Sequence, residues 1–187
     1  ATQHPTGTTV LEPGLLLQYK RPRNTPPLRI THVFKKTVHV VAYGTPSEAR
    51  NARKPHPLGR AQIEADLKDG SASLCTEDLP EELFRTLFSA NPSTPKKSSS
   101  GGDSSSPSEI VFEWIKPLIK DLETEENLAP TRFKALISRR ASALHMCDST
   151  VRRLVIRYYY FGRVREALIP LVPGPQPKDV PGCARKR

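Results

Sequence analysis

The chain has 187 residues, 36% of them hydrophobic, with 19 prolines and a formal net charge of +10. This length and composition predict two modest cores joined by irregular chain, and they exclude one large globular core. The charge favours a polyanionic partner, either nucleic acid or an acidic membrane surface, and no apolar run approaches the length of a membrane span. The N-terminus lacks the pattern of a secretory signal, so the default expectation is a cytoplasmic protein.

Cysteine usage argues against a metal centre. Cys75, Cys147 and Cys183 are widely separated and form no CxxC pair. His145 lies close to Cys147, but no standard spacing supplies the two further ligands that zinc needs. We therefore expect no metal site and no cofactor.

Residues 1–27 are predicted to be an irregular arm, in which residues 15–17 either dock on the first domain or form its first strand. Over residues 28–43, β-branched residues alternate in part with polar ones, which predicts a hairpin that turns near Lys35 and Lys36.

The remainder of the first domain is predicted from helical spacing. Residues 59–69 and 80–88 each carry apolar residues at the spacing of a short helix. Residues 28–90 are thus expected to form a small α+β or barrel-like module. His32 and His39, on the two strands of the hairpin, are interpreted as satisfied or solvated side chains rather than as catalytic groups.

Residues 91–107 mark a domain boundary. They contain seven serines, three prolines and two glycines, with no large apolar residue. Such a segment cannot bury enough surface to offset the entropy of ordering, so we predict a flexible linker.

Beyond the linker, residues 110–122 have the pattern of an amphipathic helix. Trp114 is expected to anchor the core, and Pro117 to kink or break the helix. The acidic run of residues 121–126 ends this helix, and its negative charge is unfavourable next to phosphate. Pro130 at the first helical position, or Thr131 as a cap, opens the next helix.

The stretch of residues 140–161 is the most informative part of the chain. It predicts the end of one helix, a break at residues 145–147, and a second helix. The apolar stripe of the second helix comprises Val151, Leu154, Val155 and Tyr158. Its opposite face comprises Ser149, Arg152, Arg153, Ile156 and Arg157. A short helix packed against a basic second helix is the arrangement of the helix-turn-helix motif in DNA-binding proteins.

Charge supports this interpretation over an ordinary solvated helix. Residues 131–167 contain nine Lys/Arg against only Asp148 and Glu166. A local excess of this size is the footprint expected for phosphate binding. Among the neighbouring tyrosines, we expect Tyr158 in the core and Tyr159 and Tyr160 half-buried, rather than stacked on bases.

The run of residues 140–170 resembles the helix-turn-helix region of TnsB-type, Mu-like transposases. The matching positions are Leu144, Met146, Thr150, Val151, Arg153, Arg157, Tyr158, Gly162, Ala167, Leu168 and Pro170. Residues 28–70 are more weakly similar to the small β-containing module that precedes this region. His145 stands in place of the family's turn glycine and Cys147 in place of its capping serine, so Asp148 or Ser149 is expected to cap the second helix.

The resemblance implies sequence-specific binding of transposon-end DNA by the N-terminal part of such a transposase. The family's catalytic domain, in which two aspartates and a glutamate hold metal ions, is expected to lie beyond this chain, which by itself should be no enzyme. Implied partners are double-stranded DNA and other transposition proteins, an endonuclease or an AAA+ ATPase subunit, with no membrane. Two alternatives remain, a stand-alone transcription regulator and a protein-interaction adaptor.

The predicted fold is therefore α+β, with the β-containing module, the linker, an all-α helix-turn-helix domain over residues 108–170, and a basic extended tail over residues 171–187. Arg152 and Arg153 are the candidates for base edges. The other candidate DNA contacts are Ser149, Thr150, Arg157, Arg163 and Arg165 in the domain, and Lys178, Arg185, Lys186 and Arg187 in the tail.

Overall fold

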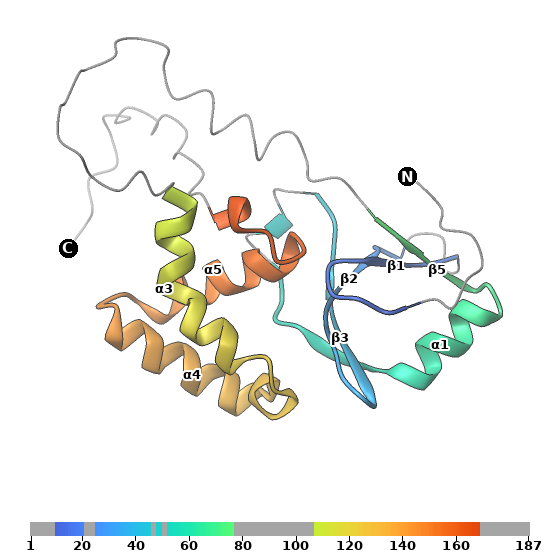
Figure 1. Cartoon of the computed structure of the whole chain (residues 1–187), viewed down its shortest axis with the longest axis horizontal. Helices are drawn as coiled ribbons and strands as arrows, with labels where there is room; N and C mark the ends of the chain where they lie inside the picture. The colour runs from blue at the N-terminus through green and yellow to red at the C-terminus, as the bar shows by residue number, and fades with distance from the viewer. Residues whose placement is uncertain (1–9, 21–24, 46–47, 50–51, 77–106, 169–187) are drawn as a thin grey trace, which may run out of the picture.

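The computed structural model describes residues 10–20, 25–45, 48–49, 52–76 and 107–168. A five-stranded antiparallel sheet with the order β4-β3-β2-β1-β5 is followed in the chain by a group of helices (Figure 1). The class is mixed α+β, as predicted. We call the described part of residues 10–76 the sheet unit and residues 107–168 the helical unit.

The sheet unit contains the predicted hairpin and more. Its elements are β1 Leu16–Tyr19, β2 Leu28–Val33, β3 Thr37–Ala42, β4 His56–Gly59, α1 Arg60–Lys68 and β5 Ala72–Cys75. The hairpin of β2 and β3, its turn at Lys35 and Lys36, and the helix expected over residues 59–69 are confirmed.

Within the arm predicted over residues 1–27, the alternative that residues 15–17 form the first strand is confirmed in part, because β1 covers Leu16–Tyr19. This strand lies inside the sheet, paired with β2 on one side and β5 on the other. Leu16 and Leu17 are buried in different hydrophobic clusters, because the sheet is covered on both faces. A short strand that is buried on both faces does not show the alternation of apolar and polar residues from which a strand is usually predicted.

Three further expectations concern residues that lie wholly or mostly outside the described part. The helix expected over residues 80–88 and the tail over residues 171–187 lie there, as does the predicted linker up to residue 106. Pro107, the last residue of that predicted linker, instead begins helix α3.

A β-bulge decides which face of the sheet His32 occupies. Strands β2 and β3 pair Ile30 with Val40 and then His32 with His39, which leaves Thr31 as the extra residue. The Thr31 hydroxyl donates a hydrogen bond of 3.0 Å to the carbonyl of His39. Since a slip of one residue exchanges the two faces of a strand, the bulge turns His32 away from the face of Ile30 and toward the helical unit.

The helical unit contains three α-helices. Its elements are α3 Pro107–Asp121, η2 Glu125–Leu128, α4 Pro130–Ala143, α5 Asp148–Tyr160 and η3 Arg165–Leu168. Pro130 opens α4, as predicted. Among the described residues, no helix is both long and apolar enough to cross a bilayer.

Two expectations for α3, a break at Pro117 and a core position for Trp114, are wrong. The helix continues through Pro117, because Ile115 and Leu118 beside it are buried at 0% and 2% exposure and hold the backbone against the core. Trp114 is 36% exposed and is not a core anchor, since the buried stripe runs through Val111, Ile115, Leu118 and beyond.

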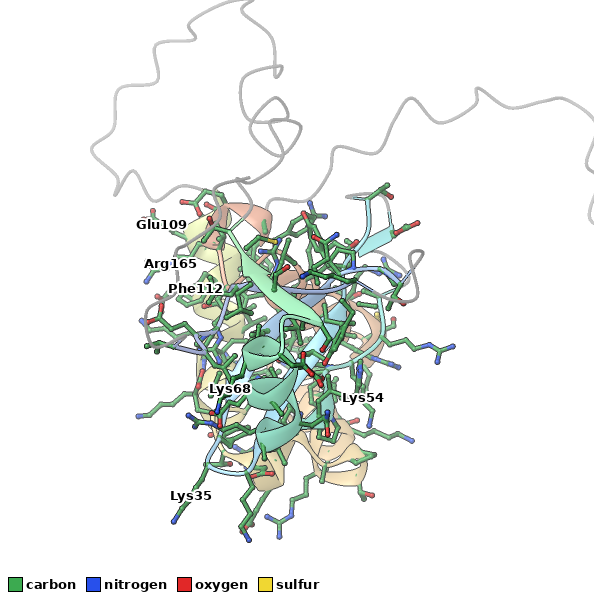
Figure 2. The ribbon with its side chains drawn as sticks, turned by 90° about the vertical axis from the view of Figure 1, so that its right-hand side faces the viewer. Lys35, Lys54, Lys68, Glu109, Phe112 and Arg165 are labelled. Carbon is green, nitrogen blue, oxygen red and sulfur yellow. The ribbon has the colours of Figure 1, made fainter. Side chains whose placement is uncertain are left out.

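The two units share a core instead of being separate bodies. One hydrophobic cluster lies within the helical unit, and one between the sheet and α1. The third cluster combines Leu16, Val41, Tyr43 and Ala49 of the sheet unit with Tyr160, Phe161 and Ala167 of the helical unit. Helix α5 therefore packs directly against β2 and β3, and Figure 2 views this arrangement from the side of α1.

This packing buries all three consecutive tyrosines. Tyr158, Tyr159 and Tyr160 are 8%, 0% and 1% exposed. The prediction that the last two are half-buried is wrong, because the sheet unit covers the side of α5 that they occupy. Burial also leaves none of the three rings accessible for stacking on a base.

Candidate nucleic-acid interface

Helices α4 and α5 are joined by a tight turn. The backbone N–H of Met146 donates a hydrogen bond of 3.0 Å to the carbonyl of Ala141. His145 adopts a φ of 53°, in the left-handed region that favours glycine. His145 therefore occupies a turn position whose backbone conformation glycine adopts more readily. Leu144 and Met146 pack against the core of the helical unit and hold the turn in place.

Helix α5 begins after Cys147, one residue earlier than a cap at Asp148 would allow. The carbonyl of Cys147 accepts hydrogen bonds from the backbone N–H groups of Thr150 and Val151, at 3.0 and 3.3 Å. The expectation that Asp148 or Ser149 caps the helix is wrong. The carboxylate of Asp148 instead accepts a hydrogen bond from the hydroxyl of Ser138 on α4.

The thiol of Cys147 lies among hydroxyl groups at the start of α5. Its Sγ is 3.2 Å from the hydroxyl oxygen of Ser149 and 2.9 Å from that of Thr150. Hydrogen bonding from Ser149, and then from Thr150, lowers the pKa of the exposed Cys147 thiol to about 7. The two hydroxyls are therefore already engaged within the first turn of α5.

The outward face of α5 changes character along its length. Ser149, Arg152 and Arg153 in the first two turns are exposed. Ile156, which the sequence pattern placed on the polar face, is only 5% exposed. Ala49 and Ala52 of the sheet unit line the same groove as Ile156. Only the N-terminal half of α5 is accessible to a partner on this face.

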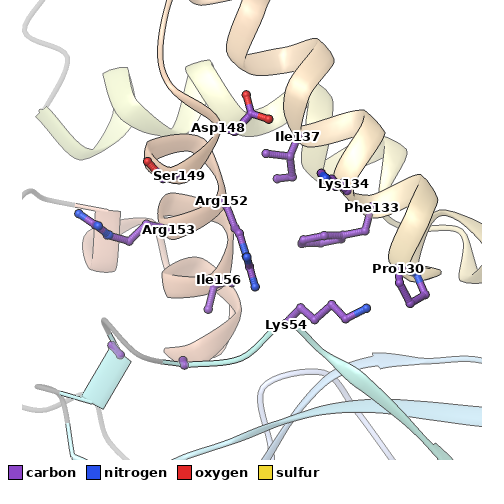
Figure 3. Close-up of a pocket in the computed structure, with 12 residues that line it drawn as sticks. Lys54, Pro130, Phe133, Lys134, Ile137, Asp148, Ser149, Arg152, Arg153 and Ile156 are labelled. Carbon is purple, nitrogen blue, oxygen red and sulfur yellow. The ribbon is translucent and has the colours of Figure 1, made fainter.

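A groove of about 580 Å³ separates α4, α5 and the segment around Lys54 (Figure 3). Figure 3 shows Arg152 pointing into this groove and Arg153 pointing away from it. The groove is lined by Ala49, Ala52, Lys54, Pro130, Phe133, Lys134, Ile137, Asp148, Ser149, Arg152, Arg153 and Ile156. The two arginines thus leave the same helix in different directions.

The positive charge of the groove is not neutralised by the protein. Within the described part of the chain, no carboxylate lies within ion-pair distance of Arg152, Arg153, Lys54 or Lys134. Asp148 is the acidic residue of the lining, and its carboxylate is bound to Ser138. The groove therefore presents four cations to solvent.

Other basic residues of the helical unit are paired with the acidic run of residues 121–126. The pairs are Arg139–Asp121 at 3.3 Å, Arg132–Glu126 at 2.8 Å and Arg163–Glu123 at 3.1 Å. This run therefore neutralises part of the excess positive charge noted in the sequence. Lys134, Arg152 and Arg153, which line the groove, have no such carboxylate partner among the described residues.

The structure brings together only some of the residues predicted to bind DNA. Ser149, Arg152 and Arg153 lie together at the groove, and Thr150 is exposed nearby without lining it. Arg157 is half-buried, with its guanidinium 5.8 Å from the centre of the Phe161 ring.

The other predicted contacts lie elsewhere or outside the described residues. Arg163 is half-buried, pairs with Glu123 and lies 5.7 Å from the Tyr159 ring centre. The guanidinium of Arg165 covers the Phe112 ring of α3 at 4.5 Å. The tail residues Lys178, Arg185, Lys186 and Arg187 are outside the described part of the chain.

Two basic residues of the groove were missed by sequence reasoning. Lys134 lies on α4, where its helical position next to the buried Phe133 did not distinguish it from any solvated lysine. Lys54 comes from an irregular segment of the sheet unit, and no local pattern connects it to α5. Only the packing of the two units brings it to the groove.

Comparisons with models of known protein families and with curated proteins find no match for this chain. Within the described residues, no group of three or more His, Cys, Asp or Glu side chains is arranged to hold a metal ion. The geometry and charge of the groove are therefore the observations from which a function can be argued.

Proposed function

We propose that the chain binds duplex DNA in a sequence-specific manner, as the N-terminal end-binding part of a TnsB-like transposase taking part in DNA transposition. The observation that carries the proposal is a helix-turn-helix whose second helix exposes two unpaired arginines in its first two turns. In helix-turn-helix readers, the N-terminal residues of the second helix contact base edges. Arginine can bond there to guanine O6 and N7 at once.

The distribution of charge supports DNA binding over a merely solvated helix. Four basic residues of the helical unit, Lys116, Arg132, Arg139 and Arg163, have carboxylate partners, whereas Arg152, Arg153 and Lys134 have none among the described residues. Unpaired cations around one reading helix are what a polyanion requires. The resemblance to TnsB-type transposases adds the expectation that the bound DNA is a transposon end.

The proposal assigns different roles to the predicted arginines. Arg152 and Arg153 contact base edges, and their different directions place their contacts at different base pairs. Arg157 and Arg163 are half-buried against aromatic rings, so their main role is to hold α5 and the following turn. Arg165, which is exposed, remains a candidate phosphate contact.

The test begins with selection of duplexes from a randomised pool by the chain itself. Fluorescence anisotropy then compares the selected duplex with a scrambled one across a salt series. We expect a preference for the selected sequence that persists at physiological salt. Equal and steeply salt-dependent affinity for both duplexes would mean that the protein binds DNA through a basic surface without sequence preference.

The same experiment separates the alternatives. A stand-alone regulator would select a palindromic site and occupy it as a dimer. A protein-interaction adaptor would bind neither duplex. A selected site without two-fold symmetry, occupied by one chain per site, is the result expected from the end-binding proposal.

A further inference from the structure

The groove beside the reading helix is built from both units of the protein. Helix α4 contributes Lys134 to one wall, and the sheet unit contributes Lys54 to the floor (Figure 3). Arg152 points into the space between them. Thus three unpaired cations from three separate segments face one groove.

Direct contacts between the two units hold the sheet unit beside α5. The Tyr160 hydroxyl, at the end of α5, is hydrogen-bonded at 2.8 Å to both the N–H of Gly44 and the carbonyl of Thr45. Tyr43 and Ala49 are buried in the same cluster as Tyr160. Lys54 follows shortly after these residues, so its position relative to the reading helix is set by a shared core.

The position of Lys54 suits contact with a phosphate. A helix that reads the major groove is flanked by the sugar–phosphate backbones, where Lys and Arg contacts orient the protein on the duplex without reading bases. The second half of α5 is closed by the sheet unit, with Ile156 at 5% exposure. A duplex seated on the first two turns of α5 therefore meets the sheet unit where α5 becomes covered, and Lys54 lines the groove there without a carboxylate partner among the described residues.

We infer that the sheet unit is part of the DNA interface, and that Lys54 together with Lys134 of α4 binds backbone phosphates of the duplex that α5 reads. This inference rests on the proposed function of α5. It gives the first unit of the chain a direct contact with nucleic acid. The orientation of the duplex then depends on how the two units pack, because Lys54 belongs to the sheet unit and Lys134 to the helical unit.

Salt dependence is the measurable consequence. Each lysine that neutralises a phosphate of B-DNA contributes about −0.9 to the slope of log K against log salt concentration. Loss of one such contact therefore reduces the ratio of Kd at 200 mM to Kd at 50 mM salt by about 3.5-fold. The preference for the selected over the scrambled duplex does not change, because phosphate contacts carry no direct sequence information.

The experiment compares Lys54→Ala and Lys134→Ala with the matched control Lys68→Ala. Lys68 is an exposed lysine in the last turn of α1, which packs on β3, β4 and β5 and not on the helical unit. The full chain and its variants are titrated with the selected and scrambled duplexes between 50 and 200 mM salt, values chosen to span the usual range of counterion effects. Thermal unfolding of each variant verifies that the fold is retained.

We expect Lys54→Ala and Lys134→Ala each to lower the salt slope by about 0.9 on both duplexes, with Lys68→Ala unchanged. Ethylation of individual phosphates should then identify one phosphate that weakens wild-type binding but not binding by Lys54→Ala. A slope for Lys54→Ala equal to that of Lys68→Ala, on DNA that the wild type binds specifically, overturns the inference and leaves the proposed function standing. Failure of the wild type to bind any duplex overturns both.

Discussion

The hydroxyl of Tyr160 accepts a hydrogen bond of 2.8 Å from the backbone N–H of Gly44, and it donates one of 2.8 Å to the carbonyl of Thr45. Tyr160 is the last residue of α5, and Gly44 closely follows β3. This contact therefore attaches helix α5 to the sheet unit. One residue earlier, the buried hydroxyl of Tyr159 has no hydrogen-bond partner among the described residues.

The two neighbouring tyrosines should respond in opposite directions to the loss of a hydroxyl. Tyr160→Phe leaves two backbone groups without their partner, so we expect the free energy of unfolding to fall by about 1–3 kcal/mol. Tyr159→Phe removes an unsatisfied buried group and should raise that free energy by roughly 1 kcal/mol. Tyr158→Phe is the matched control, because the Tyr158 hydroxyl forms no hydrogen bond within the described part of the chain, and its loss should change the free energy of unfolding little. Urea unfolding of the three variants measures all of these values, and a loss of stability in Tyr159→Phe would contradict the assignment.

The two exposed arginines of α5 should specify different base pairs. Arg152→Ala and Arg153→Ala should each cost about 1–3 kcal/mol of binding to the selected duplex and relax the sequence preference at one position. Because their side chains diverge, the relaxed positions should differ between the variants. Arg139→Ala is the control, since Arg139 is an arginine of α4 that pairs with Asp121. Competition with single-base variants of the selected duplex gives the profiles. Equal losses of affinity for selected and scrambled DNA would remove both arginines from base recognition.

His32 should make stability fall as the pH falls. Burial against the helical unit, then the charge of Arg163 and then His39, lower the pKa of His32 to about 3. The unfolded chain binds this proton near pH 6.5, so between about pH 6.5 and 3 the unfolded state holds more protons than the folded one. The free energy of unfolding therefore decreases in this window, by up to about 1.4 kcal/mol per pH unit from this residue.

Denaturant unfolding between pH 7.5 and 5 tests this dependence, because folded His32, with its pKa of about 3, remains neutral over this range. His32→Phe should flatten the pH dependence, because phenylalanine carries no proton to gain. A variant His32→Phe with an unchanged slope would assign the acid sensitivity to other groups.

The left-handed backbone at His145 should favour glycine. A residue with a side chain loses roughly 1–2 kcal/mol in this conformation, whereas glycine loses about 0.5–1 kcal/mol through the greater freedom of the unfolded chain. We therefore expect His145→Gly to raise the free energy of unfolding by about 0.5–1 kcal/mol. His145→Ala keeps the strain at a φ of 53° and should bring no gain. Thermal unfolding of both variants distinguishes them, and a less stable His145→Gly would mean that the histidine side chain itself supports the turn.

Local patterns in the sequence were sufficient for several elements. The hairpin of β2 and β3, helix α1 and the turn between α4 and α5 depend on the alternation, helical periodicity and turn chemistry of neighbouring residues. These properties depend on residues that are close together in the sequence, so they can be recognised without knowing which other element packs on each face. The exposed Arg152 and Arg153 followed from the same helical periodicity.

Only the tertiary structure decided which faces of these elements are covered. Ile156 and Tyr159 are buried because the sheet unit packs on α5, and β1 is a strand because two other strands pair with it. Lys54 reaches the groove for the same reason. The local pattern of a sequence indicates which side chains favour burial. The surface that buries them is formed by residues distant in the chain. The two surfaces come into contact only when the chain folds.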